Sequence, residues 1–408
     1  MSLNLDNKTR LDKFIKENLN NEEKQVFPIT LKGQKKLLKV YKLPIRYLFY
    51  NIRNGRFAAE YAELVKREGG VLQPEESKDA EKIKNMLLDL DKIETKRTYN
   101  DIKIRGQWNP GVITEDGYVV DGNRRMAILS QLFDDTGQEE WKYLLVARLE
   151  EPISAEDLWK LEAGIQLGKD EIVRYGPVNE LLKLKEGIDA GLSKREIIKT
   201  LYGYEKEEEI EEKLNRLDLI EQYLKFFGIP KKYSKVKKRV EHLINLQNIL
   251  VKCREKEYDP EVIQKIKYFV FQLIKEGTSH LEIRKIGSMI EEDVADAISE
   301  IETAASQLKP IEPKAGEEII EEEVEAAIDE YEYDETRSPT QTHFRNASDF
   351  LDVKRNEGKE IVLLNRAEKN LKPLISQKNI DFTKSDCVNL IEKIFNYANT
   401  LKQKIHEK

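Results

Sequence analysis

The sequence predicts an α+β protein with a small α/β core near the N-terminus and a mostly helical C-terminal two-thirds. Three observations support this fold class. Short β-branched segments alternate with turn residues between residues 37 and 155. From residue 156 onward, apolar residues recur at helical spacing. The chain has 408 residues, which is long for one domain, so we expect several.

The N-terminal part divides into an extension and a core. Residues 1–36 are predicted to be a helical extension, because four apolar residues fall on one helical stripe: Leu11, Phe14, Ile15 and Leu19. Residues 37–155 are predicted to form the α/β core. Strands are expected within residues 37–50, 111–120 and 143–149, the second as a hairpin-like pair, with helical stretches at 58–67 and 79–95.

Residues 156–308 are predicted to be a helical domain that contains a helix-turn-helix-like unit at about 191–220. Ser193 and Glu196 have the spacing of a capping box at the start of its first helix. The second helix begins in the acidic run 205–212, which the phosphates of a DNA groove would repel. We therefore favour a packing module or a protein docking surface over a helix that reads bases.

The C-terminal region changes character twice. Residues 309–345 are predicted to be an acidic linker or partner-binding segment, because Glu317–Glu335 contains no basic residue. Residues 346–408 regain helical periodicity as a short module. This module is too small for a large core of its own, so we expect it to dock or to self-associate.

Composition limits the possible partners. No apolar run approaches the length of a membrane span, so no membrane partner is expected. Two distant cysteines indicate neither a disulfide framework nor a cysteine zinc site, and they favour the cytoplasm. The four histidines lack metal-ligand spacing, so no metal site is predicted with certainty. With a net charge of −7, any affinity for DNA must come from a local basic patch.

One basic run is a candidate for such a patch, although a solvated surface is the alternative. It follows a glycine-proline break and contains a tyrosine, a pattern that suits phosphate contacts independent of base sequence. Its candidate DNA-contact residues are Lys231, Lys232, Lys235, Lys237, Lys238 and Arg239.

Residues 117–129 are the most informative segment. They read as a β-branched strand, an Asp-Gly turn and a helix that opens on two arginines. Gly122 would let backbone N–H groups approach an anion, and the helix N-terminus adds partial positive charge. The planar guanidiniums of Arg124 and Arg125 suit phosphate oxygens. The segment therefore predicts a phosphate site, although taken alone it also fits an ordinary turn with a solvated helix start.

Four short boxes occur in an order that resembles the ParB/sulfiredoxin-like superfamily over roughly residues 37–170. The matching residues are Asn51, Asn54 and Arg56, then Gly106, Asn109 and Pro110, then Gly122, Arg124, Arg125 and Ala127, and finally Gln166. The resemblance implies a ParB-like nucleotide-binding domain followed by a ParB-like helix-turn-helix region. It also implies a nucleoside triphosphate, CTP or ATP, bound with Mg²⁺. The implied nucleotide-binding residues are Asn51, Asn54, Arg56, Gly106, Asn109, Gly122, Asn123, Arg124, Arg125 and Gln166.

Two positions depart from the pattern of the ParB branch. Asn123 stands where that branch has a glutamate implicated in nucleotide turnover and where sulfiredoxins have a reactive cysteine. Sulfiredoxin chemistry is therefore excluded, and slow hydrolysis or none is expected, with Asn123→Glu raising turnover. Asp121 resembles the D-G-x-x-R variants found in ParB-like serine kinases and restriction components, which makes it the candidate catalytic residue.

Three functions follow as hypotheses. We favour a ParB-like nucleotide-binding protein that acts with DNA in a plasmid, phage or defence setting, the nucleotide being a conformational switch. The first alternative is an enzyme that uses Asp121: an NTPase, a nuclease-type restriction component or a small-molecule kinase. The second is a non-catalytic adaptor whose acidic segments bind other proteins. Fold resemblance alone does not choose among them.

Overall fold

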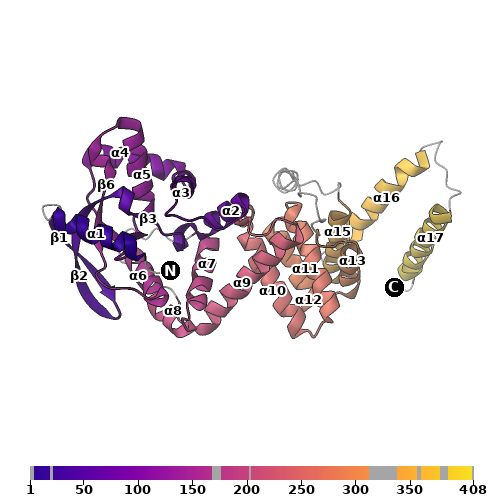
Figure 1. Ribbon diagram of the computed structural model, residues 1–408. Coiled ribbons are helices and arrows are strands. Elements are labelled where there is room, and N and C mark those ends of the chain that lie inside the picture. Colours follow the sequence, from indigo (N-terminus) through magenta and orange to yellow (C-terminus); the bar gives the residue numbers. More distant parts are fainter. Residues whose placement is uncertain are drawn as a thin grey trace.

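The computed structural model describes residues 4–18, 22–167, 176–201, 204–311, 338–355, 360–376 and 385–406. An N-terminal α/β domain is followed by a succession of helices that leads away from it (Figure 1). This arrangement confirms the predicted α+β class. Within the described ranges, every helix is too short or too polar to span a bilayer.

Six strands form one mixed sheet in the order β1-β2-β6-β4-β5-β3. β1–β2, β2–β6 and β4–β5 pair antiparallel, whereas β4–β6 and β3–β5 pair parallel. The hairpin expected within 111–120 is confirmed as β4 and β5. The strands are β1 (Glu22–Leu31), β2 (Gln34–Pro44), β3 (Phe49–Tyr50), β4 (Gly111–Ile113), β5 (Tyr118–Asp121) and β6 (Tyr143–Arg148).

The helical extension predicted over residues 1–36 is wrong beyond its first half. Helix α1 (Leu5–Glu17) bears out the apolar stripe for Leu11, which is fully buried, and for Phe14 and Ile15, whereas Leu19 lies outside the described residues. Residues 22–31, however, form strand β1. Lys32 and Gly33 both have positive φ values of 52° and 75°, which suits the tight two-residue turn that joins β1 to β2 as a hairpin.

Successive residues of each strand point to opposite faces of the sheet, and both faces carry apolar side chains. On one face, the strands share a core with α1, α3 (Ser77–Asp89) and α5 (Asn123–Thr136). Helix α4 (Lys92–Arg105) packs against α5. The strand residues of this core include Ile113, Val119, Leu144 and Val146. On the other face, α6 (Ala155–Leu167) covers a set that includes Val112, Val120, Leu145 and Ala147. The sheet is therefore buried on both sides, and α5 starts at the end of β5.

Helices α6 to α9 link the two parts of the chain. A small core joins α6, α7 (Pro177–Asp189), α8 (Lys194–Thr200) and α9 (Glu207–Phe226); it contains Trp159, Leu184, Ile197 and Ile210. The largest core follows, among α9, α10 (Val240–Glu255), α11 (Pro260–Lys275), α12 (His280–Glu291), α13 (Ala295–Ala305) and α15 (Pro339–Lys354). The short 3-10 turns are η2 (Ile45–Tyr47), η3 (Gly55–Phe57), η4 (Glu139–Lys142) and η5 (Tyr233–Val236).

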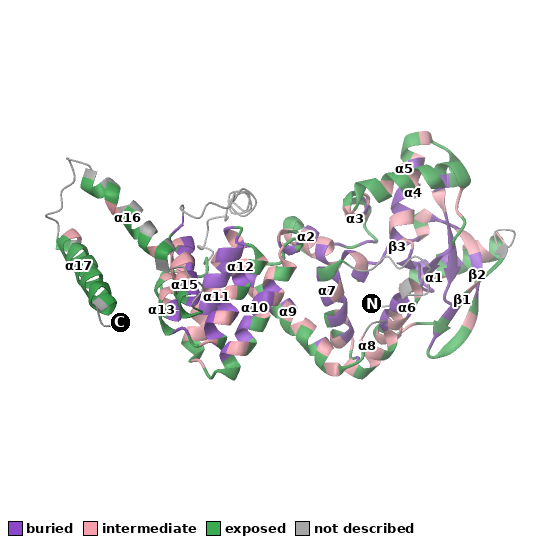
Figure 2. Cartoon of the chain, turned by 180° about the vertical axis from the view of Figure 1, so that it is seen from behind, coloured by how far each residue is buried: buried purple, intermediate pink, exposed green. Residues whose placement is uncertain are grey.

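The predicted C-terminal boundaries need correction. Helix α15 begins at Pro339, and its residues Phe344, Ala347 and Leu351 are buried in the large helical core. Residues 339–354 therefore belong to the helical domain and not to a linker or a separate module. Beyond it lie α16 (Glu360–Ser376) and α17 (Ser385–His406), and the described part of α17 is largely exposed (Figure 2). The acidic segment Glu317–Glu335 lies outside the described residues.

Candidate functional site

Helix α5 starts directly after the Asp-Gly turn that the sequence singled out. Gly122 is its N-cap with φ 112°, a left-handed conformation that a side chain would strain. A Cβ on Gly111, the facing residue of β4, would lie 2.5 Å from the Asp121 carbonyl oxygen, so the backbones approach closely here. Among the described residues, no side chain caps this helix end. Its first N–H groups are therefore available to an anion.

Two arginines from distant segments lie close enough for their charges to repel, and one of them is in the first turn of this helix. Burial lowers the pKa of Arg124, and the positive charge of Arg56 lowers it further, against the opposing charges of Asp91, Glu94 and Glu60. Arg56 comes from η3, and its Nε is buried without a hydrogen-bond partner among the described residues. Neither guanidinium forms an ion pair within the described ranges. An anion between the two would relieve both the repulsion and the missing hydrogen bond.

Arg125 has a different environment from Arg124. Its Nη1 donates a hydrogen bond to the carbonyl oxygen of Asn109, in the loop before β4. Burial lowers the pKa of Arg125, and the nearby carboxylate of Asp121 opposes this. Asp121 itself is buried at the end of β5. Arg125 therefore connects the start of α5 to the loop before β4. Because its guanidinium already has this partner, Arg125 is less available than Arg124 to bind a phosphate.

Three of the four predicted asparagines, Asn51, Asn54 and Asn123, hold the chain in place. Asn123 Oδ1 accepts a hydrogen bond from the Asn51 N–H at 2.9 Å, and Asn123 Nδ2 donates to the Val119 carbonyl at 2.7 Å. Asn54 Nδ2 donates to the Val120 carbonyl at 3.1 Å. All three side chains are buried. They shape the site by fixing the loop after β3 against β5, and their contacts indicate support of the site, not direct ligand binding.

The same loop is tied to α6 and α7 on its other side. The Gly55 N–H donates to Glu162 Oε1 at 3.0 Å. The side chain of Asn179 donates to the Arg56 carbonyl at 3.0 Å and accepts from the Ala59 N–H at 2.9 Å. Sequence reasoning missed Glu162 and Asn179. The available signal for Glu162 was its place on an otherwise apolar face of α6, whereas Asn179 shares its side of α7 with Lys183 and Glu186 and gave no such signal.

Lys183 completes this support. Its Nζ lies 2.9 Å from Glu162 Oε2 and 2.9 Å from Glu186 Oε2, and its side chain is 1% exposed. Burial alone would lower the pKa of Lys183, but the two glutamates outweigh burial and raise it. Burial also raises the pKa of Glu186. A charged lysine is thus held where α6, α7 and the loop after β3 converge, and Trp159 contacts it at 5.3 Å.

A cleft of about 660 Å³ adjoins the loop on the side of α6 and α7. Asn51 lines it, and Asn51 Nδ2 has no hydrogen-bond partner among the described residues. The cleft wall includes Glu162, Glu186 and Asp189, which would repel phosphate. Phosphates are therefore better accommodated on the other side of the loop, beside Arg56 and Arg124.

Two predicted residues lie apart from this group. Gly106 ends α4 with φ 75°, and Gln166 is in the last turn of α6, where its side chain lies outside the described residues. Across the described ranges, no group of three or more His, Cys, Asp or Glu residues is arranged to hold a metal ion.

Most residues of the predicted DNA-contact run form contacts with other residues of the chain. Lys237 Nζ lies 2.8 Å from Glu60 Oε1, and the Ser234 N–H donates to Glu63 of α2 (Ala58–Glu68). Arg239 Nη1 donates to the Lys235 carbonyl at 2.7 Å. Lys232, Lys235 and Arg239 take part in further interactions. Lys231 and Lys238 are exposed. The run therefore fastens η5 to α2, which leaves less charge for DNA.

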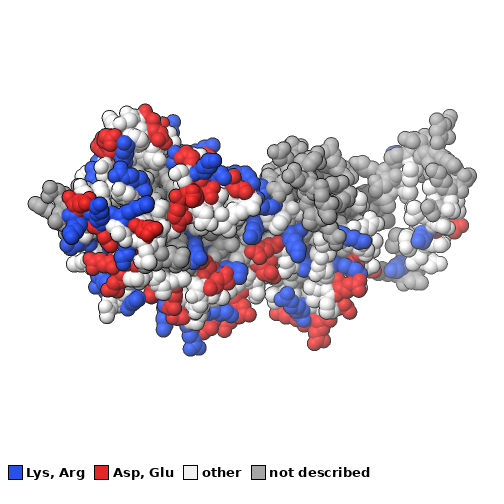
Figure 3. Space-filling view, in the orientation of Figure 1, with Lys and Arg blue, Asp and Glu red and all other residues white. Residues whose placement is uncertain are grey.

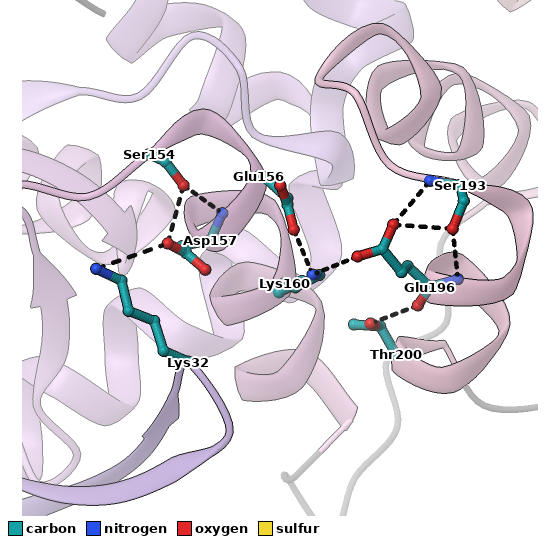
Figure 4. Close-up of polar contacts among 8 residues, drawn as sticks. All are labelled: Lys32, Ser154, Glu156, Asp157, Lys160, Ser193, Glu196 and Thr200. Carbon is teal, nitrogen blue, oxygen red and sulfur yellow. Dashed lines mark hydrogen bonds and ion pairs between the residues drawn. The ribbon is translucent and has the colours of Figure 1, made fainter.

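The helix-turn-helix-like unit is also held by its own charges. The capping box is confirmed, since Ser193 and Glu196 exchange side-chain and backbone hydrogen bonds at the start of α8. Lys160 on α6 binds Glu196 at 3.2 Å and so attaches α8 to the α/β domain (Figure 4). At the start of α9, Glu207 lies 2.6 Å from Arg195 and Glu211 lies 2.6 Å from Lys194. These contacts agree with a packing role.

Basic and acidic side chains are interspersed over much of the face that Figure 3 shows. No model of a known protein family matches the chain, and no curated protein matches it either.

Proposed function

We propose that the chain is a ParB-like nucleotide-binding protein that acts with DNA and binds phosphates at the first turn of α5. The observation that carries the proposal is an uncapped helix end beside Arg124, which forms no ion pair within the described ranges, with Arg56, whose buried Nε has no described hydrogen-bond partner, close enough to repel it. Arg56 and Arg124 come from the first and third boxes of the resemblance, 68 positions apart in the sequence. Two convergent guanidiniums and free backbone N–H groups suit the phosphates of a nucleoside triphosphate, CTP or ATP. Mg²⁺ would then arrive with the nucleotide.

The nucleotide acts as a conformational ligand in this proposal. Arg56 belongs to the loop whose backbone is bound by Glu162 of α6 and Asn179 of α7. A phosphate that draws Arg56 toward Arg124 would favour one position of this loop over another. Because α7 leads into α8 and α9, the bound state would be transmitted to the helical domain as a population shift.

Slow hydrolysis or none is part of the same proposal. The carboxamide of Asn123 is already used by Asn51 and Val119, so it is poorly placed to orient a water or bind a metal. Asp121 is buried at the end of β5, close enough to Arg125 for the two charges to interact. The enzyme alternative would require Asp121 to leave this interaction.

A thermal-shift panel on the full chain tests the proposal. ATP, ADP, CTP and GTP are each added with Mg²⁺, and a nucleotide that binds only the native state at 100 times its Kd adds roughly 2.7 kcal/mol of stability. Arg124→Ala, with a ten- to hundredfold weaker affinity, is expected to reduce this gain to roughly 0.4–1.4 kcal/mol. Arg67→Ala, which removes an exposed arginine of α2, serves as the matched control and is expected to keep it. No shift with any nucleotide at millimolar concentration would refute the phosphate site.

A further inference from the structure

Helix α4 presents an unusual outer surface. Ile93 is 82% exposed and Ile104 is 81% exposed, although large aliphatic residues are ordinarily buried. Trp108, just beyond the helix, is 72% exposed. The helix lies at the end of the α/β domain remote from α10–α13 (Figure 1). The inward side of the helix carries Ile102, which is buried, so Ile93 and Ile104 are apolar residues on the outer side.

The exposed residues of α4 lie on one face. Ile93 and Ile104 are eleven residues apart, which is close to three full helical turns, and Arg97 and Asn100 fall between them on the same stripe. Lys96 and Lys103 flank the stripe, and both are exposed. The result is a strip about 16 Å long that has an isoleucine at each end and basic side chains on it and beside it.

The charge of this helix is predominantly positive. Lys92–Arg105 contains five basic residues and two acidic ones. Arg97 and Arg105 make only long, exposed contacts of 3.4 Å with Glu94 and Asp101 of the same helix. Lys96 and Lys103 form no ion pair within the described part of the chain. Lysine is depleted in protein–protein interfaces, so this composition favours a polyanion over a protein partner.

Trp108 is held in position despite its exposure. Its Nε1 donates a hydrogen bond to the Arg105 carbonyl at 3.0 Å, which satisfies the polar edge of the indole. The next residue, Asn109, accepts a hydrogen bond from Arg125 at the start of α5. The indole is therefore anchored to the C-terminal end of α4, and the backbone next to it contacts the start of α5. A fixed, exposed aromatic ring next to cations is the arrangement on which unpaired bases stack.

We propose that the α4 surface, defined as Ile93, Lys96, Arg97, Lys103, Ile104 and Trp108, binds single-stranded nucleic acid. The lysines and Arg97 contact phosphates, and Trp108 and the isoleucines contact base faces. A duplex hides those faces, whereas a single strand offers them, and stacking tolerates any base. This inference deepens the DNA association proposed above by naming its surface and strand state. It does not require nucleotide binding at α5.

The three tryptophans give the test a built-in reporter. Trp108 is exposed, whereas Trp141 and Trp159 are buried at 5% and 2% exposure. Titration of the full chain with a 20-mer of oligothymidine is therefore expected to quench the tryptophan fluorescence until the protein is saturated. In Trp108→Ala this quenching should be absent. Anisotropy of a labelled oligothymidine gives the affinity. Trp108→Ala is expected to weaken binding roughly five- to 150-fold, and Trp108→Phe should retain most of it.

Two lysine variants separate phosphate contact from general charge. The double variant Lys96→Ala with Lys103→Ala should lose two phosphate contacts. The slope of log K against log salt concentration should therefore become shallower by about 1.4, the value for two contacts on a single strand. Lys13→Ala with Lys16→Ala removes the same charge from the exposed side of α1 and should leave the slope unchanged.

Several results would overturn the inference. One is an affinity for a duplex of equal length that matches or exceeds that for the single strand. Another is undiminished oligothymidine binding by Trp108→Ala. A third is concentration-dependent self-association that Trp108→Ala abolishes, since the surface would then join two copies of the chain. If nucleotides shift the melting temperature while oligothymidine fails to bind, only this inference falls. If oligothymidine binds while no nucleotide shifts the melting temperature, only the proposal of a phosphate site at α5 fails.

Discussion

The side chain of Asn123 fastens the backbone of Asn51, accepting its N–H at 2.9 Å across 72 positions of sequence. The other end of the same carboxamide donates to Val119 at 2.7 Å. One buried side chain thus joins the loop after β3, strand β5 and the first residue of α5. Arg56 follows in that loop and Arg124 in that helix, so this contact joins the two segments that carry the arginines.

Removal of this carboxamide should destabilise the protein. Asn123→Ala leaves the Asn51 N–H unpaired in a buried position, so we expect the free energy of unfolding to fall by about 1–3 kcal/mol. Asn123→Glu should also destabilise, because a carboxylate cannot donate to the Val119 carbonyl; its expected effect is loss of stability and not a gain in turnover. Urea denaturation measures both. Asn109→Ala, at an exposed side chain, is the control, and equal stability of all four proteins would disprove the role of this contact.

The two adjacent arginines should respond differently to truncation. Arg124→Ala removes a charge-assisted phosphate contact worth roughly 1.5–3 kcal/mol, so nucleotide affinity should fall about ten- to a hundredfold while stability without ligand is retained. Arg125→Ala removes the bond to the Asn109 carbonyl and should lower stability instead. Calorimetric titration and urea denaturation of both variants separate the two effects. Equal nucleotide affinity in wild type and Arg124→Ala would contradict the assignment.

Lys183 is expected to be the most sensitive charged residue of the α6–α7 junction. Lys183→Met leaves Glu162 and Glu186 without their buried counter-ion, a change that typically costs 3–5 kcal/mol, so we expect a loss of about that size. Lys185→Met, at an exposed neighbour on α7, should change stability by less than about 0.5 kcal/mol. Chemical denaturation compares the two. Similar losses for both variants would show that the buried pair does not stabilise the junction.

The start of α8 should weaken in acid. The backbone N–H and hydroxyl of Ser193, with Lys160, lower the pKa of Glu196 from 4.5 to about 2. Because the folded-state pKa is the lower one, the carboxylate contributes stability above pH 4.5 that is lost as the pH falls toward 2. Amide hydrogen exchange in α8 should therefore accelerate over this range.

Glu196→Gln provides the comparison for this pH dependence. The amide cannot ionise, so the acceleration of exchange in α8 between pH 4.5 and 2 should be smaller than in the wild type. An identical acceleration in both proteins would mean that other carboxyl groups govern the acid response of this helix.

Local sequence signals determined the features that depend on near neighbours. The β4–β5 hairpin, the Ser193–Glu196 capping box and the start of α5 after Gly122 all follow from residues within a few positions of one another. These predictions succeeded because periodicity, turn geometry and capping are set by short-range contacts.

Tertiary structure alone decided how those residues are used. Strand β1 forms because β2 pairs with it, and α15 joins the helical domain because the core accepts Phe344. The sequence offered Asn123 as a ligand, but its partner Asn51 lies 72 positions away. Gly55 and Glu162 are separated by 107 positions. Which buried polar groups meet depends on how sheet and helices pack, and no spacing along the chain encodes that directly.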